Sequence, residues 1–122
     1  MIGYVTLGTN DLGRAAKFYD ALLAEIGAKR IMEFDRGIAW GVSHTQPGLG
    51  MMQPFDGKPA TVGNGVMVAL IVDSKEKVDR LYNKALELGA TDEGPAGARS
   101  DGFYAGYFRD PDGNKLNVFC MG

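Results

Sequence analysis

The sequence contains an internal repeat, because its second half follows the same order of segments as its first half. At an offset of 62 to 63 residues, apolar and aromatic positions coincide, and the segments LLAEIGA and ALELGA match after one gap. The aligned pairs are Tyr4 with Met67, Val5 with Val68, Leu7 with Leu70, Tyr19 with Tyr82 and Leu23 with Leu86. Similarity at a fixed period indicates a repeated structural unit. We therefore expect two copies of one folding module.

The first half has the pattern of a strand, a helix and three further strands. Residues 2–8 alternate apolar and smaller side chains, as strands do. Asn10 and Asp11 then supply an N-cap, the apolar side chains from 12 to 26 recur at helical spacing, and Gly27 ends the helix. Extended segments follow at 29–34, 37–43 and 49–54, separated by turn residues.

The second half repeats this order. After the strand VMVALIV at 66–72, Asp73 and Glu76 have the spacing of a capping box, and Gly89 closes the helix as Gly27 closed the first. Strands are expected near 91–94, 102–109 and 114–120.

The chain is expected to form one α+β domain, residues 1–122, built from two tandem βαβββ modules that form a curved mixed sheet around a cavity. The first module covers about 1–55 and the second about 64–122. A stretch rich in Pro and Gly, residues 54–65, joins them.

Composition excludes several classes of protein. The net charge of -2 gives no basic face for nucleic acid. The longest apolar run, around 66–72, is far shorter than the ~20 residues that span a bilayer, and no secretory signal is visible. The single cysteine, Cys120, cannot form an internal disulfide. We expect a cytoplasmic protein without a nucleic-acid or membrane partner.

Strand alternation predicts which side chains face away from the two helices. If Val5 and Leu7 face a helix, Tyr4 and Thr6 face the cavity, and the same parity places Met67 in the cavity. In the last strand the helix side takes Leu116, Val118 and Cys120, which leaves Asn117 and Phe119 inside.

The opening YVTLGTNDLGRAAKFYDALL and the closing GYFRDPDGNKLNVF, together with the paired modules, resemble the vicinal oxygen chelate superfamily. That superfamily includes lactoylglutathione lyase, extradiol dioxygenases and bleomycin-resistance proteins. The segments DGKPATVGNGVMVAL and GPAGARSDGFYAGYFRDPDGNK further resemble its bacterial glyoxalase-like subgroup. The resemblance covers essentially the whole chain and implies the glyoxalase/bleomycin resistance/dioxygenase fold.

The resemblance implies a metal site, and the residues at its positions do not fit one. Metal enzymes of the superfamily place His, Gln or Glu on the first and fifth strands, and Glu or His on the fourth and eighth. These positions fall here on Tyr4, Met67 and Asn117, and residues 45–55 contain no His, Asp or Glu. A phenol, a thioether and a neutral amide are poor ligands for the usual metals. We expect no divalent metal and no other cofactor.

Other reactive side chains have structural interpretations. His44 lies at a strand end and is expected at the surface or pocket rim. Cys120 alternates with the same side of the last strand as Leu116 and Val118, so we expect it in the core, where cysteine is inert. Asp110 and Asp112 belong to a D-P-D-G-N turn, in which they cap backbone N–H groups. Arg99, in the loop AGARSDG, is expected to be solvated, although it could reach an anionic group at the mouth of the cavity.

We predict that the cavity binds a small hydrophobic or aromatic molecule without a metal, in a protein that is a homodimer. The candidate pocket residues are Tyr4, Trp40, Met67, Tyr104, Tyr107, Asn117 and Phe119. Two alternatives stay open: a lactoylglutathione lyase-like or dioxygenase-like enzyme with an atypical metal site, and a non-catalytic interaction protein with a filled cavity. The sequence identifies no catalytic residue and leaves open whether the cavity forms within one chain or across a dimer.

Overall fold

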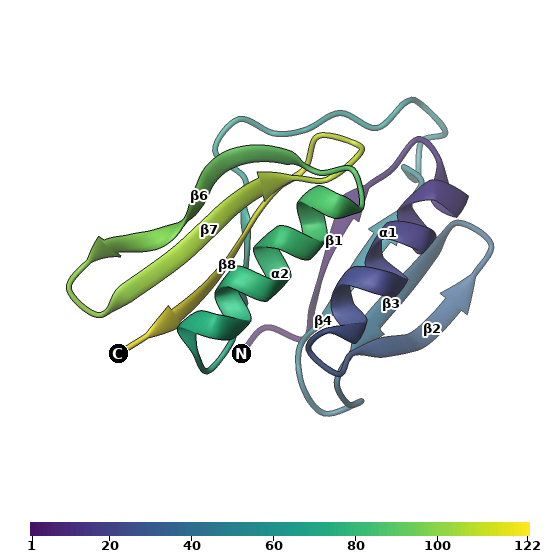
Figure 1. Cartoon of the computed structure of the whole chain (residues 1–122). Coiled ribbons are helices and arrows are strands. Elements are labelled where there is room, and N and C mark those ends of the chain that lie inside the picture. Colours follow the sequence, from purple (N-terminus) through teal and green to yellow (C-terminus); the bar gives the residue numbers. More distant parts are fainter. The chain divides into compact units, whose positions relative to one another are not determined.

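The computed structural model describes residues 1–122 and divides them into two compact units, 1–62 and 63–122 (Figure 1). Each unit has the order strand, helix and three strands, so the two tandem modules predicted from the repeat are present. Neither helix is long and apolar enough to cross a membrane.

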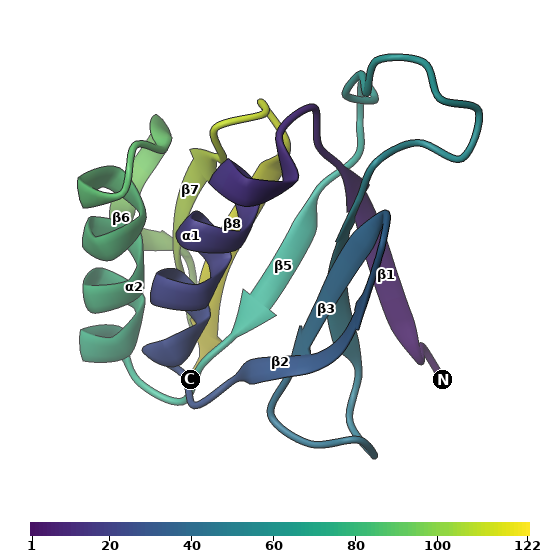
Figure 2. The same ribbon diagram turned by 90° about the vertical axis from the view of Figure 1, so that its right-hand side faces the viewer.

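The first unit is a four-stranded mixed sheet with one helix on it. Its strands lie in the order β1-β4-β3-β2, with β1 parallel to β4 and the other neighbours antiparallel. The elements are β1 (Tyr4–Gly8), α1 (Leu12–Ala24), β2 (Lys29–Phe34), β3 (Gly37–Gly41) and β4 (Gly48–Met52). Figure 2 shows the edge strand β1 beside the strands of its own sheet.

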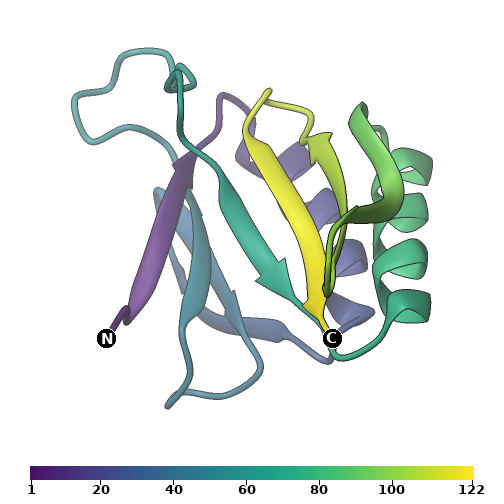
Figure 3. The same cartoon turned by 90° about the vertical axis from the view of Figure 1, so that its left-hand side faces the viewer.

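The second unit repeats this arrangement. Its strands lie in the order β5-β8-β7-β6, again with the first and last strands of the module parallel. The elements are β5 (Val68–Ile71), α2 (Lys75–Glu87), β6 (Thr91–Ser100), β7 (Phe103–Arg109) and β8 (Lys115–Met121). Figure 3 shows α2 lying along one face of this sheet.

The two helices begin at different kinds of cap. Asp11 caps α1 as predicted, because its carboxylate accepts the Arg14 backbone N–H at 3.0 Å. The predicted capping box at Asp73 is wrong, because α2 begins one residue later. Ser74 has the extended backbone of an N-cap and its hydroxyl accepts the Lys77 N–H at 3.2 Å. Asp73 forms an ion pair with the Lys77 side chain instead.

Both helices end as predicted. Gly27 and Gly89 have φ values of 77° and 104°, the left-handed conformation that glycine adopts after a helix. The next residue then closes a backbone bond to the last turn, from Ala28 to Leu23 and from Ala90 to Ala85. The two copies of the module therefore share their helix-ending device as well as their strand order.

The strand β6 is longer than predicted, because it continues through a stretch for which the sequence predicts a loop. It runs to Ser100 and includes Gly94, Pro95 and Gly97, with three irregularities in its register against β7. An edge strand tolerates a proline and bulges, because one side of it makes no ladder bonds. Arg99, which we expected in a loop, therefore lies in a strand.

Candidate functional site

Each sheet has a face that its helix does not cover, here called the helix-free face. In the first unit this face carries Tyr4 and Thr6 of β1, both exposed, and Tyr4 is 72% exposed. Their partners on β4 are Gly48 and Gly50, which have no side chains. A Cβ at Gly50 would lie 3.3 Å from the Thr6 methyl group, so the floor of this face is closely packed backbone. Tyr4 therefore supplies an aromatic ring to this face, and Tyr4 and Thr6 each supply a hydroxyl group.

Trp40 lies on the opposite side of the first sheet, so the prediction that it lines the cavity is wrong. It is 1% exposed, its ring packs against Tyr19 of α1, and its Nε1–H donates to Asp20 at 2.9 Å. Its register partner Leu49 is also buried on the helix side. The indole is a core side chain with a satisfied polar group.

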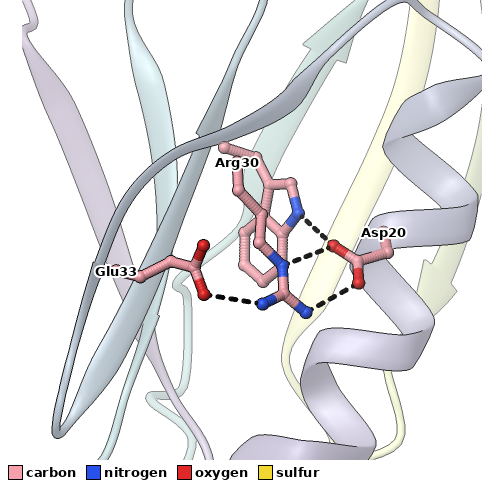
Figure 4. Close-up of polar contacts among 4 residues, drawn as sticks. Asp20, Arg30 and Glu33 are labelled. Atoms are coloured by element: carbon pink, nitrogen blue, oxygen red, sulfur yellow. Dashed lines mark hydrogen bonds and ion pairs between the residues drawn. The ribbon is translucent and has the colours of Figure 1, made fainter.

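Asp20 joins α1 to the sheet through more than the indole. Its carboxylate also accepts two hydrogen bonds from the Arg30 guanidinium, at 2.7 and 2.9 Å, and Arg30 donates to Glu33 as well (Figure 4). The hydrogen bond from Arg30 is the main reason that the pKa of Asp20 is lowered from its usual value. This charged cluster fixes the helix, and it lies on the helix side of the sheet.

Tyr104 is also on the helix side, which corrects the second prediction of this kind. Its register partner on β8 is the buried Cys120, and its hydroxyl donates to Asp79 of α2 at 2.7 Å. That hydrogen bond is the main cause of a raised pKa of the Tyr104 phenol. Tyr104 therefore fastens α2 to β7, as Trp40 fastens α1 to β3.

The helix-free face of the second sheet brings several predicted residues together. Asn117 of β8 pairs with Tyr107 on one side and with Ala69 on the other, so all three point away from α2. Two places along β8, Phe119 lies on the same face and stacks on Phe103 with ring centroids 5.4 Å apart. Met67 directly precedes β5 and is exposed.

Asn117 is the unusual member of this face. It is 2% exposed, and its side-chain oxygen is buried without a hydrogen-bond partner. A buried amide normally finds partners, since leaving one unpaired costs about 1–3 kcal/mol. Asn114, three residues earlier and also buried, follows that rule: its amide donates to the Asp110 carboxylate at 3.0 Å. Asn117 therefore differs from Asn114 in having a buried side-chain oxygen without a hydrogen-bond partner in the chain.

Two cations lie over the ring of Tyr107. The Arg99 guanidinium is 5.4 Å from the ring centroid and the Lys115 ammonium is 5.7 Å from it. Such contacts stabilise both the cation and the orientation of the ring. Sequence reasoning did not single out Lys115 or Phe103, although Lys115 shares the parity of Asn117 along β8.

Asp110, Cys120 and His44 lie where the sequence predicted. The Asp110 carboxylate accepts the backbone N–H groups of Asp112 and Asn114, both at 2.9 Å, and so closes the turn before β8. Cys120 is buried beneath α2, and His44 is exposed in the connection between β3 and β4. None of them contributes to either helix-free face.

The sequence and the fold match a known group of proteins. A family model described as the Glyoxalase/Bleomycin resistance protein/Dioxygenase superfamily matches residues 1–118. The chain belongs to this superfamily.

Solved structures agree with that assignment. A glyoxalase/bleomycin resistance protein from Albidiferax ferrireducens T118 is 35% identical, with a TM-score of 0.89 over 98% of this chain and 97% of that one. A hypothetical protein from S. aureus is 27% identical, with a TM-score of 0.77 over 99% and 93%. A family enzyme from Burkholderia phytofirmans PsJN, 20% identical, has a TM-score of 0.79 over 98% of both chains. No curated protein matches.

The positions at which the superfamily places metal ligands do not carry a suitable donor set here. Tyr4, Met67 and Asn117 occupy three of them, and Gly50, which corresponds in register to Asn117, occupies the fourth. No three His, Cys, Asp or Glu side chains gather in a metal-binding group. A phenol, a thioether and an amide offer no carboxylate or imidazole, the ligands that divalent metals such as Zn²⁺ and Mn²⁺ prefer. These residues do not fit the metal.

Proposed function

We propose that the protein binds a small hydrophobic or aromatic molecule on its helix-free sheet faces, without a metal. The observation that carries this proposal is the Asn117 side-chain oxygen, which is buried and has no partner in the protein. An unpaired buried amide lowers stability, and native proteins retain such groups where they serve a function. A ligand that donates a hydrogen bond to Asn117 supplies the missing partner.

The side chains around Asn117 indicate what kind of molecule it is. Tyr107 lies beside it across the ladder, and the stacked pair of Phe103 and Phe119 lies further along the same face. Ligand sites are mostly apolar and aromatic, with a few polar groups that fix orientation. A flat organic molecule that packs on these rings and bonds to one amide fits this composition.

Tyr4 and Met67 add a ring and a polarisable side chain at the equivalent positions of the two modules. Both are exposed, and neither makes a polar contact that would give it a structural role. Exposed large apolar side chains also mark surfaces that bind a ligand or another chain. We include a homodimer in the proposal for this reason. Sedimentation at several protein concentrations tests it, and a monomer at all of them would remove this part.

The names of similar structures agree with ligand binding and leave room for catalysis. The 35% identical structure is named as a glyoxalase/bleomycin resistance protein, which covers both kinds of activity. More distant structures include a lactoylglutathione lyase from Agrobacterium tumefaciens and a fosfomycin resistance protein from Mesorhizobium loti, at 21% and 18% identity. Those two show the shared fold alone.

The proposal is tested on protein purified without an affinity tag. Native mass spectrometry reports any organic molecule that copurifies, and elemental analysis reports metal. A library of aromatic compounds and antibiotics is then screened by thermal unfolding, with Asn117→Leu as the variant and Asn114→Leu as the control for loss of a buried asparagine. We expect binders that stabilise the wild type and Asn114→Leu but not Asn117→Leu.

Three outcomes would replace the proposal. Stoichiometric Ni, Zn or Fe, with activity lost on chelation, would show a metal enzyme. Turnover of the methylglyoxal-glutathione hemithioacetal that Tyr4→Phe abolishes would show a lyase. No shift with any compound would show an interaction protein with a filled cavity.

A further inference from the structure

The first unit contains a cavity of about 440 Å³ that no predicted site residue lines. One wall is the turn between β1 and α1, with Thr9 and Asn10, and the other is formed by Arg36 and the segment 53–59. Figures 2 and 3 show this segment, in teal, as part of a loop beyond the end of β1. The volume falls within the ~300–1,000 Å³ of small-molecule sites.

The loop that forms the wall is fixed at both ends. At one end the backbone N–H of Gln53 donates to the Arg36 carbonyl at 2.8 Å, and the Arg36 guanidinium donates to the Gln53 carbonyl at 2.9 Å. At the other end the Asn10 amide both accepts from and donates to the backbone of Ala60, at 2.6 and 3.1 Å. Gly8 makes room for this contact, since a Cβ there would lie 2.9 Å from that of Ala60. The cavity is therefore preformed.

The charged side chains that line the cavity are both cations. Arg36 and Lys58 reach it, and no acidic residue lines it. Neither cation forms an ion pair, whereas Arg30 and Arg109 elsewhere in the chain both do. The nearby carboxylate of Asp56 accepts the Lys58 backbone N–H and does not neutralise the ammonium. Two unpaired cations at one preformed cavity attract an anion.

An aromatic ring lies beside these cations. Phe55 lines the cavity and is 90% exposed, and the Arg36 guanidinium lies 5.3 Å from its ring centroid. An exposed phenylalanine in a fixed loop offers a flat apolar surface on which a ring can stack. We propose that this cavity is a second binding site, for a small organic anion in which a phosphate or carboxylate is attached to a flat ring.

The anionic group pairs with Arg36 and Lys58, and the ring stacks on Phe55. The site is separate from the one proposed above, because none of the residues proposed there, Tyr4 and Asn117 included, lines this cavity. It also selects a different class of ligand, since two cations attract an anion to this cavity, whereas a neutral amide bonds to the ligand at Asn117.

The experiment titrates the full-length protein with phenyl phosphate and follows backbone amides by NMR. Phenol serves as the ligand without charge and inorganic phosphate as the ligand without a ring. We expect saturable shifts around Phe55 and Lys58, with a dissociation constant of about 1 mM or below for a ligand of this size. Phenol and inorganic phosphate should each bind more weakly.

Four variants identify the contacts. Lys58→Gln and Arg36→Gln should each weaken phenyl phosphate binding about 10-fold, as expected for a lost charge-assisted hydrogen bond. Phe55→Ala should weaken phenyl phosphate and leave inorganic phosphate unchanged. Lys29→Gln removes an exposed cation of the same unit that does not line the cavity, and it should bind as the wild type does.

Lys58→Gln decides the matter if Arg36→Gln disturbs the loop, because the Lys58 side chain makes no hydrogen bond that holds the fold. Equal affinity in Lys58→Gln and the wild type, or no saturable shift at the cavity, would overturn the proposal. Asn117→Leu separates the two sites: it should abolish binding of the hydrophobic ligand and leave phenyl phosphate affinity unchanged.

Discussion

The two units have the same backbone plan and carry different chemistry on it. At the position where β1 and β4 pair in the first unit, the helix-free face has Gly50. At the equivalent position of β8, the second unit has Asn117, with Phe119 two places along. The helix-free face of the first unit therefore has a glycine and the exposed Tyr4, whereas that of the second unit has the Asn117 amide beside aromatic rings.

The helix sides of the two units differ much less. Each sheet holds its helix with an aromatic ring whose polar atom bonds to a helix carboxylate, the buried Trp40 to Asp20 and the partly buried Tyr104 to Asp79. Tyr19 of α1 and Tyr82 of α2 are aligned in the repeat, and both side chains are buried. Packing constrains the covered face, so the copies stay alike there, while the helix-free faces carry different side chains.

The largest effect is expected from Trp40→Ala, which removes the ring beneath α1. Truncation of a fully buried aromatic side chain should lower the free energy of unfolding by about 3–5 kcal/mol. Because Trp40 is the only tryptophan, unfolding must be followed by circular dichroism in denaturant. Trp40→Phe keeps an aromatic ring at this position and should lower the free energy of unfolding by less. A loss below about 1 kcal/mol for Trp40→Ala would contradict the placement of this side chain in the core.

Asn117→Leu and Asn114→Leu should change stability in opposite directions. Replacement of the unpaired Asn117 amide by an apolar group of similar size should raise the free energy of unfolding of the ligand-free protein by about 1–2 kcal/mol. Asn114→Leu removes a bond to the Asp110 carboxylate and should lower it by about 1–3 kcal/mol. Equal destabilisation by both, in denaturant unfolding, would show that Asn117 is an ordinary structural residue.

Ser74→Ala tests the corrected start of α2. Loss of the hydroxyl that accepts the Lys77 N–H should lower the free energy of unfolding by about 1 kcal/mol. Asp73→Ala removes only a solvated ion pair and should have the smaller effect. The reverse order, measured by thermal and denaturant unfolding, would restore Asp73 as the cap.

The smallest effect concerns acid stability and Asp20. Its pKa is lowered in the folded protein, chiefly by the hydrogen bond from Arg30, so its carboxylate stabilises the fold at pH values above its unfolded pKa of about 4. That contribution is lost as the pH falls through the lowered pKa. Asp20→Asn should therefore be less stable than the wild type near neutral pH, by up to about 1 kcal/mol because the side chain is partly solvated. The two proteins should converge below the folded pKa, and a constant difference across the titration would refute this cause.

Local patterns in the sequence predicted the modules, the helix ends and the alternation of the last strand. Leu116 and Val118 are buried on one side, and Asn117 and Phe119 lie on the other, as their order implies. Gly27 and Gly89 ended their helices because few other residues adopt a positive φ there.

The sequence placed Trp40 and Tyr104 wrongly because parity requires a known register. Strands β3 and β7 contain glycines and aromatics without clear alternation, and a shift of one residue moves every side chain to the other face. The cavity beside Arg36 and Lys58 was missed for another reason. The bonds between Asn10 and Ala60 join residues 50 positions apart, and no local pattern reveals them.

The most direct test of the proposed function is thermal unfolding of the wild type and Asn117→Leu, in chelator, with the best ligand from the aromatic library. At a concentration about 100 times its dissociation constant, the ligand should stabilise the wild type by about 2.7 kcal/mol. Asn117→Leu should be the more stable protein without ligand and should gain almost nothing from it. The same gain in both proteins, or a gain that requires added metal, would contradict metal-free binding at Asn117.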